Sequence, residues 1–363
     1  MSGARLASAP PGLADDIPIL EDYLSRALQS SVAIRKISQS YPGISRETWI
    51  VRASANGQPA DLIVRVDPPE GGGAGTSMQF EWQIFSRLHG SGVPVPEPLW
   101  FDETPALTGG RPLMVRRFVE GSSSVEGLHL PGEDGRERRW ATTRECVEKL
   151  ALVHQLDWEA RGFADIMPAP SRPGDCWQSE IRIWRDIWQR RQPMPDPIID
   201  EALCWLAEHA PDDTPCISLV KGNNGLGEEI WNDTRIVAMS DWEMASLGDG
   251  IADLFWSQGT LRLAPFDDII RHYESCMEQR ISPERLVFAA AFATAKQFIA
   301  TVCNFYGPYF EGRTRRIYSL GGLTYAAGFR HRLGQCIGQP LLDVWPLFQN
   351  DEKSLYTRLG SAR

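Results

Sequence analysis

Hydrophobic positions in the first third of the chain change from a helical period to a strand period. Residues 17–30 place apolar side chains at the spacing of an amphipathic helix. The β-branched segments after them are separated by turn-forming residues, which predicts strands at 32–38, 48–54, 61–67, 93–101 and 111–121. A Gly-rich connector at 68–77 leads into a helical pattern at 78–92, which Gly90 and Gly92 end. This part of the chain therefore predicts a small β-rich lobe that carries helices.

Longer helical patterns dominate the rest of the chain. A polar loop is expected at 122–137. The predicted helices beyond it are 143–157, 177–191, 198–210 and most of 265–345. One β-rich interruption lies among them, at 216–245. The pattern predicts an α+β protein with four parts: a flexible leader at 1–16, an N-terminal lobe at 17–121, a helical lobe at 122–345 and a tail at 346–363.

Composition narrows the classes of partner. The 363 residues carry a formal net charge of −10, which argues against the clustered basic surface that nucleic acid requires. The N-terminus lacks a signal peptide's apolar run, and we identify no membrane span of about 20 apolar residues, so we expect a soluble cytoplasmic protein. The seven cysteines form no C-x-x-C pair and indicate neither a disulfide framework nor a zinc site. A small-molecule substrate or a protein is the expected partner, and the oligomeric state stays open.

Several residues occur in the order that a kinase needs. A kinase requires donors over the phosphates, a cation anchored by a carboxylate on the next helix, metal ligands, and a group that orients the attacking hydroxyl. The segment YPGISRETW at 41–49 lies between the first two predicted strands, where its amides could cover phosphates, although any Gly/Ser hairpin looks similar. In the third strand Arg65 stands where kinases have lysine, and Glu81 on the next helix could pair with it. A surface salt bridge is the alternative.

Five segments then carry a specific resemblance: LIVRVDPPEGG, FEWQIFSRLHGSGVPVPEPLWF, PLMVRRFVEG, LALVHQLDW and IWNDTRIVAMSDWEMASLGDGIADLFW. Together they resemble the aminoglycoside-phosphotransferase/choline-kinase-like family from about residue 18 to 345. The branch is similar to the kinase domain of acyl-CoA dehydrogenase family member 10, some of whose relatives phosphorylate hydroxyacyl-CoA. The resemblance implies a two-lobed protein-kinase-like fold, with a catalytic-loop region at 216–254, and transfer from ATP with Mg²⁺ to a hydroxylated small molecule.

The resemblance also implies roles for individual residues. Asp241 of SDWE corresponds to the metal-binding aspartate, with Glu243 two residues on. Asp249 and Asp253 correspond to structural carboxylates that bond backbone groups. The cofactor-binding positions that it implies are Ser45, Arg46, Arg65, Glu81, Val115 and Arg117.

The catalytic loop departs from the family. Where the family has His-Gly-Asp and then Leu-Gly-Asn, this chain reads KGNNGLGE over 221–228. Asn223 stands at the catalytic aspartate, and an amide can orient a hydroxyl but cannot accept its proton. Glu228 stands at the metal-binding asparagine, so with Asp241 it would offer Mg²⁺ two carboxylates. Lys221 replaces the loop histidine, and its ammonium could bind an anion as a point charge.

Two further features leave alternatives open. Arg116 and Arg117 replace an apolar–acidic pair at the presumed hinge, and we favour an outward Arg116 over one that obstructs the adenine site. Several aromatic residues wall an acceptor pocket or belong to the core: Trp177, Trp184, Trp188, Phe305, Tyr306 and Tyr309.

Three functions are compatible with this altered loop. The first is an ATP-dependent small-molecule kinase in which Asn223, Lys221 and Glu228 take the catalytic roles. The second is a pseudokinase that binds a ligand without phosphoryl transfer, and the third is a different reaction on the same scaffold. Because Asp241 and the loop glycines persist while charge is added, the changes indicate repurposing more than decay.

Overall fold

The computed structural model describes residues 13–40, 46–67, 76–256, 263–306 and 316–348, apart from the side chains of 305–325. The chain divides into two compact units. Unit 1 comprises Met1–His89 and Val95–Val119, and unit 2 comprises Gly90–Pro94 and Glu120–Arg363.

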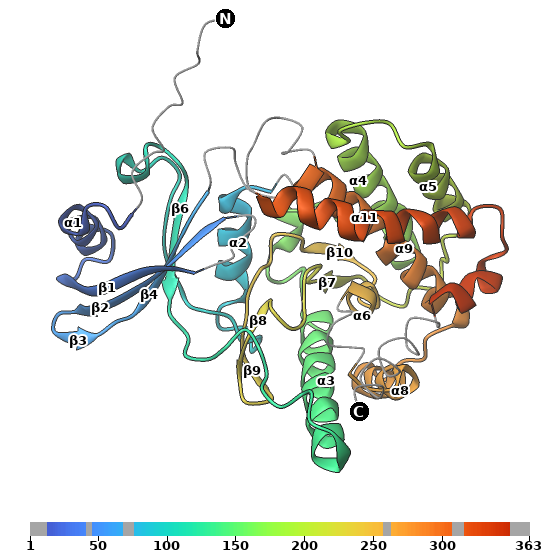
Figure 1. The fold of residues 1–363 in the computed structure, drawn as a ribbon, viewed down its shortest axis with the longest axis horizontal. Coiled ribbons are helices and arrows are strands. Elements are labelled where there is room, and N and C mark those ends of the chain that lie inside the picture. The colour runs from blue at the N-terminus through green and yellow to red at the C-terminus, as the bar shows by residue number, and fades with distance from the viewer. Residues whose placement is uncertain (1–12, 41–45, 68–75, 257–262, 307–315, 349–363) are drawn as a thin grey trace, which may run out of the picture. The chain divides into compact units, whose positions relative to one another are not determined.

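Unit 1 consists of an antiparallel sheet with two helices (Figure 1). Its elements are α1 (Ile17–Ala27), β1 (Val32–Ser40), β2 (Glu47–Ala55), β3 (Gln58–Pro59), β4 (Leu62–Val66), α2 (Met78–Leu88), β5 (Pro98–Asp102) and β6 (Leu113–Arg117). The five longer strands lie in the order β1-β2-β4-β6-β5. The predicted strands are therefore present, with a two-residue strand, β3, added in the turn after β2.

Strand β4 shows how the sheet divides its side chains between two faces. Successive side chains of a strand point to opposite faces. Leu62, Val64 and Val66 accordingly join a buried apolar cluster that includes two α1 residues, Leu20 and Leu24. Arg65 points to the other face, where its ion-pair partner lies on α2. The sheet thus has an apolar α1 face and a polar cluster beneath α2.

Unit 2 holds most of the helices and two small sheets. Its helices are α3 (Gly132–His154), α4 (Cys176–Arg191), α5 (Pro197–His209), α6 (Ala252–Trp256), α8 (Phe266–Met277), α9 (Pro283–Thr301) and α11 (Arg316–Cys336). Its strands are β7 (Ser218–Val220), β8 (Glu229–Asn232), β9 (Arg235–Met239) and β10 (Ser246–Gly248). Strand β7 pairs with β10, and β8 pairs with β9. The predicted β-rich interruption therefore forms two separate two-stranded antiparallel sheets, of which only β8–β9 is a hairpin.

The polar loop predicted at 122–137 is wrong in its second half, because α3 already begins at Gly132. Glu133 and Asp134 lie in its first turn, where carboxylates stabilise a helix N-terminus. Gly135 is packed so closely that a Cβ there would lie 1.8 Å from the carbonyl oxygen of Leu130. The first turns of α3 are polar, so no apolar period announces them.

Helix α9 lies in the core of unit 2, in contact with α4, α5, α6 and α11. Residues Pro283–Asn304 are long and apolar enough to cross a membrane by length and composition, contrary to the expectation from sequence. However, 89% of this segment's most apolar window is buried inside the protein, as in the core helix of a soluble domain. Part of this packing is aromatic, since Trp177 of α4 contacts Phe288 and Phe292 at centroid distances of 5.0 and 5.4 Å.

Candidate active site

The candidate site is built on loop 221–228, which connects β7 to β8. Gly222 adopts a φ of 84°, and a Cβ there would lie 2.1 Å from the backbone oxygen of Met244. A side chain at this position would therefore be strained and would also collide with the backbone. This requirement explains why a glycine stands between the two altered residues, Lys221 and Asn223.

A buried carboxylate on α6 holds the loop from beneath. Asp253 accepts hydrogen bonds from the backbone amides of Lys221 at 2.7 Å and Gly222 at 2.8 Å. Its Oδ2 also lies 3.0 Å from His154 Nε2, and the side-chain amide of Asn224 donates to its Oδ1 at 3.1 Å. Burial opposes ionisation, but the bonds from His154 and from the two amides lower the pKa of Asp253 below its usual value. Asp253 thus bonds the backbone as the resemblance implied.

Asp249 anchors the same region to α9. Its carboxylate accepts two bonds from the guanidinium of Arg285, at 2.9 and 2.8 Å, and a third from Thr214 Oγ1 at 2.9 Å. The three groups are almost fully buried. A bidentate, desolvated pair of this kind fixes orientation as well as adding stability. Asp249 Oδ1 also accepts a hydrogen bond from the backbone amide of Ile251 at 3.2 Å, which is the kind of backbone bond that the resemblance implied.

Asn223 is held between two neighbours. Its Nδ2 donates to Asp241 Oδ2 at 2.7 Å, and its Oδ1 accepts from the indole Nε1 of Trp256 at 2.8 Å. An aspartate at 223 would place a second negative charge against Asp241, whereas the amide donates a hydrogen bond to it. The carboxamide is therefore suited to orient a neighbouring carboxylate, and neither of its polar atoms acts as a base.

Asp241 and Glu228 form a pair of adjacent carboxyl groups. Asp241 follows β9 and has a φ of 59°, a left-handed conformation in which Gly, Asn and Asp are enriched. Burial raises the pKa of Glu228 to about 8, and the charge of Asp241 and a hydrogen bond with it act in the same direction. Two carboxyl groups this close share a proton or bind a cation.

The pair fits a divalent cation of the magnesium type. Mg²⁺ is usually bound by one or two carboxylates, and substrate phosphates and water complete its coordination. Within the described residues no cluster of three or more His, Cys, Asp or Glu side chains is arranged to hold a metal. The donor set of Glu228 and Asp241 therefore suits a metal that arrives with a phosphate ligand better than a closed structural site.

The ammonium of Lys221 is turned away from solvent. It lies 3.3 Å from Glu229 Oε1, donates to the backbone oxygens of Asn223 and Asp241, and lies 5.3 Å from the centroid of the Trp242 ring. Burial raises the pKa of Glu229 to about 7, while the charge of Lys221 lowers it. With its donors engaged in the interior, Lys221 supports the loop; the geometry does not present it to a substrate as an anion-binding point charge.

Unit 1 contains a separate buried charge cluster. Arg65 and Glu81 form the predicted ion pair, and it is buried, so the alternative of a surface salt bridge is wrong. Arg46 lies 3.4 Å from the same Glu81 and 2.7 Å from Asp67, and it donates to the backbone oxygen of Thr76. Two arginines thus share one fully buried glutamate. The guanidinium of Arg46 is committed to this cluster.

The other proposed cofactor positions of unit 1 differ in exposure. Ser45 lies outside the described residues. Val115 is fully buried in the apolar cluster on the α1 face, and the exposed Arg117 pairs with Glu97 at 2.8 Å. The favoured outward orientation of Arg116 is wrong, because its guanidinium lies over the Phe85 ring of α2, 5.2 Å from the centroid. Strand β6 is covered on both faces, which leaves only Arg117 exposed.

Two residues of the loop's surroundings were missed by sequence reasoning. Trp256 orients Asn223 but belongs to an apolar run that gives no sign of this role. Glu229 begins strand β8, next to Glu228, and its buried carboxylate lies opposite the ammonium of Lys221. An acidic residue in a strand segment close to an unexpected lysine was the one sign in the sequence that the two could pair.

The aromatic residues proposed to line an acceptor pocket do not all lie in similar surroundings. Trp177 and Trp188 are core, with exposures of 0% and 1%. Trp184 faces the side chain of Lys296. The side chains of Phe305, Tyr306 and Tyr309 lie outside the described set.

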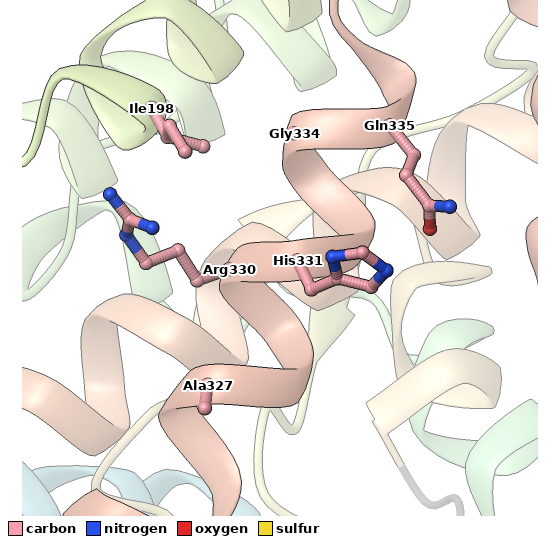
Figure 2. A pocket seen from close by; sticks show the side chains of 6 residues that line it. All are labelled: Ile198, Ala327, Arg330, His331, Gly334 and Gln335. Atoms are coloured by element: carbon pink, nitrogen blue, oxygen red, sulfur yellow. The ribbon is translucent and has the colours of Figure 1, made fainter.

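A pocket of about 410 Å³ lies elsewhere in unit 2. Figure 2 shows that its lining comes from α5 and α11: Ile198, Ala327, Arg330, His331, Gly334 and Gln335. Arg330 at this pocket is already paired with Asp196 at 2.7 Å. The pocket shares no residue with loop 221–228 or its partners.

Comparison of the sequence with known proteins identifies the family to which the chain belongs. The profile of the phosphotransferase enzyme family (APH) matches residues 41–282, which is more than half of the chain. The chain therefore belongs to the phosphotransferase enzyme family. It is 25% identical over 249 residues to rat acyl-CoA dehydrogenase family member 11, a match that covers 66% of this chain and 30% of that protein. Mouse acyl-CoA dehydrogenase family member 10 is also 25% identical, over 66% of this chain and 22% of its own length.

The chain thus spans less than a third of the length of these relatives.

Solved structures of other proteins share the fold of this chain. A candidate aminoglycoside phosphotransferase from Ralstonia eutropha superposes with a TM-score of 0.64 at 19% identity, covering 89% of this chain and 99% of its own. Aminoglycoside phosphotransferase APH(4)-Ia, in a ternary complex with ADP and hygromycin B, gives 0.57 at 15% identity, covering 88% and 99%. The expected kinase-like fold, with a β-rich N-terminal part and a helical C-terminal part, is confirmed.

Proposed function

We propose that this protein is an ATP-dependent phosphotransferase that acts on a hydroxylated small molecule, with hydroxyacyl-CoA among the candidate acceptors. The observation that carries the proposal is the pair of carboxyl groups of Glu228 and Asp241 beside Asn223. Family membership supports it. So does a structural neighbour, APH(4)-Ia, crystallised with ADP or AMP-PNP.

Each residue of the loop has a distinct part in this proposal. Asp241 and Glu228 would hold Mg²⁺, which when bound would supply positive charge to the phosphates. Asn223 fixes the orientation of Asp241, and its carbonyl oxygen, which accepts one bond from Trp256, has a second lone pair for an acceptor hydroxyl. Without a general base the rate of phosphoryl transfer is expected to be about 10²–10⁴-fold lower. Positioning of the substrates and stabilisation of charge still allow a measurable rate.

The test combines metal binding with turnover. Replacing Asp241 by asparagine keeps a residue that tolerates positive φ, so the backbone is preserved while a charge is lost. We expect Asp241→Asn to lower Mn²⁺ or Mg²⁺ affinity by more than about 100-fold, since even outer-shell partners of metal ligands are worth about 10–100-fold. Calorimetric titration measures the affinity, and ADP release with a library of hydroxyl compounds measures turnover.

Asp233→Asn is the matched control for this variant. Asp233 also has a positive φ, of 55°, but it is exposed and pairs with Arg138 on the surface. Metal affinity in this variant should equal that of the wild type. If Asp241→Asn also binds metal normally, the assignment of the carboxylate pair is wrong.

A second candidate function is a pseudokinase. It is favoured by Asn223, whose two polar atoms already have partners in Asp241 and Trp256 and which offers no proton acceptor. Nucleotide binding without ADP release for any acceptor would support this function over the first.

A further inference from the structure

Helix α9 carries one lysine deep in its apolar sequence. Lys296 is only 3% exposed and lies in a helix dominated by alanine and phenylalanine. Its Nζ lies 5.3 Å from the centroid of the Trp184 ring on α4 and 5.4 Å from that of the Trp256 ring on α6. The ammonium thus faces two indole rings from different helices.

Within the part of the chain that the structure describes, no hydrogen bond or ion pair reaches this ammonium. Lys221 offers the contrast, because its buried ammonium contacts Glu229 and two backbone oxygens. Helix α4 does carry a buried carboxylate, Glu180, but it is not paired with Lys296. Buried charges are ordinarily paired or hydrogen-bonded, and ring contacts leave the three N–H donors of an ammonium without acceptors.

The position of Lys296 relates it to the candidate active site. Trp256, whose ring faces the ammonium, donates its indole N–H to Asn223, and Asn223 in turn bonds Asp241. One indole side chain therefore connects the unpartnered cation to the residue that stands at the catalytic position. All four residues belong to unit 2.

We propose that Lys296 binds an anionic group of the acceptor, a carboxylate or a phosphate, while the hydroxyl of the same molecule is directed to Asn223. The inference rests on the proposed function and narrows it, because it names the chemical class of acceptor. The indole rings of Trp184 and Trp256 lie against the ammonium and would limit the access of water to its ion pair with the bound group, which strengthens the charge interaction.

The test measures binding without nucleotide, so that it does not depend on turnover. The probes are 3-hydroxybutyrate with its uncharged methyl ester, and glycerol phosphate with glycerol, all at matched ionic strength. Titration calorimetry should show that wild type prefers one anion over its neutral analogue by about tenfold or more, as hydrogen bonds to charged groups usually allow. The two pairs distinguish a carboxylate from a phosphate.

Lys296→Met should abolish this preference while leaving the neutral analogue's affinity unchanged, because methionine matches the length of the lysine stem without its charge. Lys296→Arg should retain a preference for the anion. Lys36→Met is the control, since it removes one positive charge from an exposed strand position. It should bind the probes as wild type does.

Thermal unfolding separates this role from a structural one. Without ligand, Lys296→Met should unfold at a temperature equal to or above that of wild type, because it removes a buried charge that no carboxylate among the described residues offsets. The anion should raise the unfolding temperature of wild type only. If Lys296→Met keeps the anion's stabilisation, or if wild type shows no preference for either anion, the inference is overturned. Anion binding without phosphoryl transfer to any hydroxyl would instead reject the proposed function alone.

Discussion

The charge cluster of unit 1 and loop 221–228 of unit 2 depart in different ways from the pattern that the family resemblance implies. In unit 1 Arg65 stands where that pattern has lysine, and its ion pair with Glu81 is formed. In unit 2 the loop backbone is held through Gly222 and Asp253, while Asn223 and Glu228 stand where that pattern has other side chains. The comparison teaches that this chain forms the ion pair and the loop backbone even where its reactive groups differ from the pattern.

The largest effect is expected from restoring the family's groups in the loop. If only the side chains have diverged, Asn223→Asp combined with Glu228→Asn should raise ATP turnover by about 10²-fold or more, because the loop regains a proton acceptor. The measurement is the rate of ADP release at saturating Mg²⁺ with the acceptor library.

The single variant Asn223→Asp provides the control. It would place three carboxylates together, at 223, 228 and 241, so without Mg²⁺ it should be less stable than the double variant. Loss of a native activity in the double variant, with no kinase activity gained, would show that the loop serves a different reaction.

An intermediate effect is expected at the buried ion pair of Lys221 and Glu229. Lys221→Met leaves Glu229 buried without its cation and should lower the free energy of unfolding by about 3 kcal/mol. Lys221→Met combined with Glu229→Leu removes both charges and should recover stability to within about 1 kcal/mol of wild type. Urea denaturation measures both. Equal losses in the single and double variants would show that the two residues are not a coupled pair.

The smallest effect is expected in unit 1. Arg65→Lys keeps a cation beside Glu81 and should lower the free energy of unfolding by much less than the about 3–5 kcal/mol that an unpaired buried charge costs, because Arg46 also contacts that carboxylate. Arg65→Met, which removes the cation, is the control and should cost more. A loss as large in Arg65→Lys as in Arg65→Met would mean that the fork geometry of arginine is essential, and unit 1 would then be less tolerant than the comparison states.

The sequence predicted the strands of unit 1 and the pairing of Arg65 with Glu81, since both follow from period and order along the chain. The family resemblance, and not their spacing, placed Asp241 of the SDWE motif near Asn223 and Glu228 of loop 221–228.

The direction of side chains was harder to predict. The sequence suggested that Lys221 could bind an anionic ligand, but in the fold its ammonium pairs with Glu229 in the interior. Arg116 was expected outside, yet α2 covers that face of its strand and its guanidinium packs on Phe85. Lys296 was not singled out, because its surroundings come from α4 and α6, which are distant in sequence. Such contacts depend on tertiary packing and leave no local pattern.

The glycine at position 222 has a consequence for how the loop can be engineered. Because Gly222 cannot accept a side chain without strain and a clash, the backbone of the loop depends on this one position. The side chains at positions 223 and 228 can be exchanged without changing that requirement. A directed search for new activities should therefore keep the glycine at 222 and vary the residues around it.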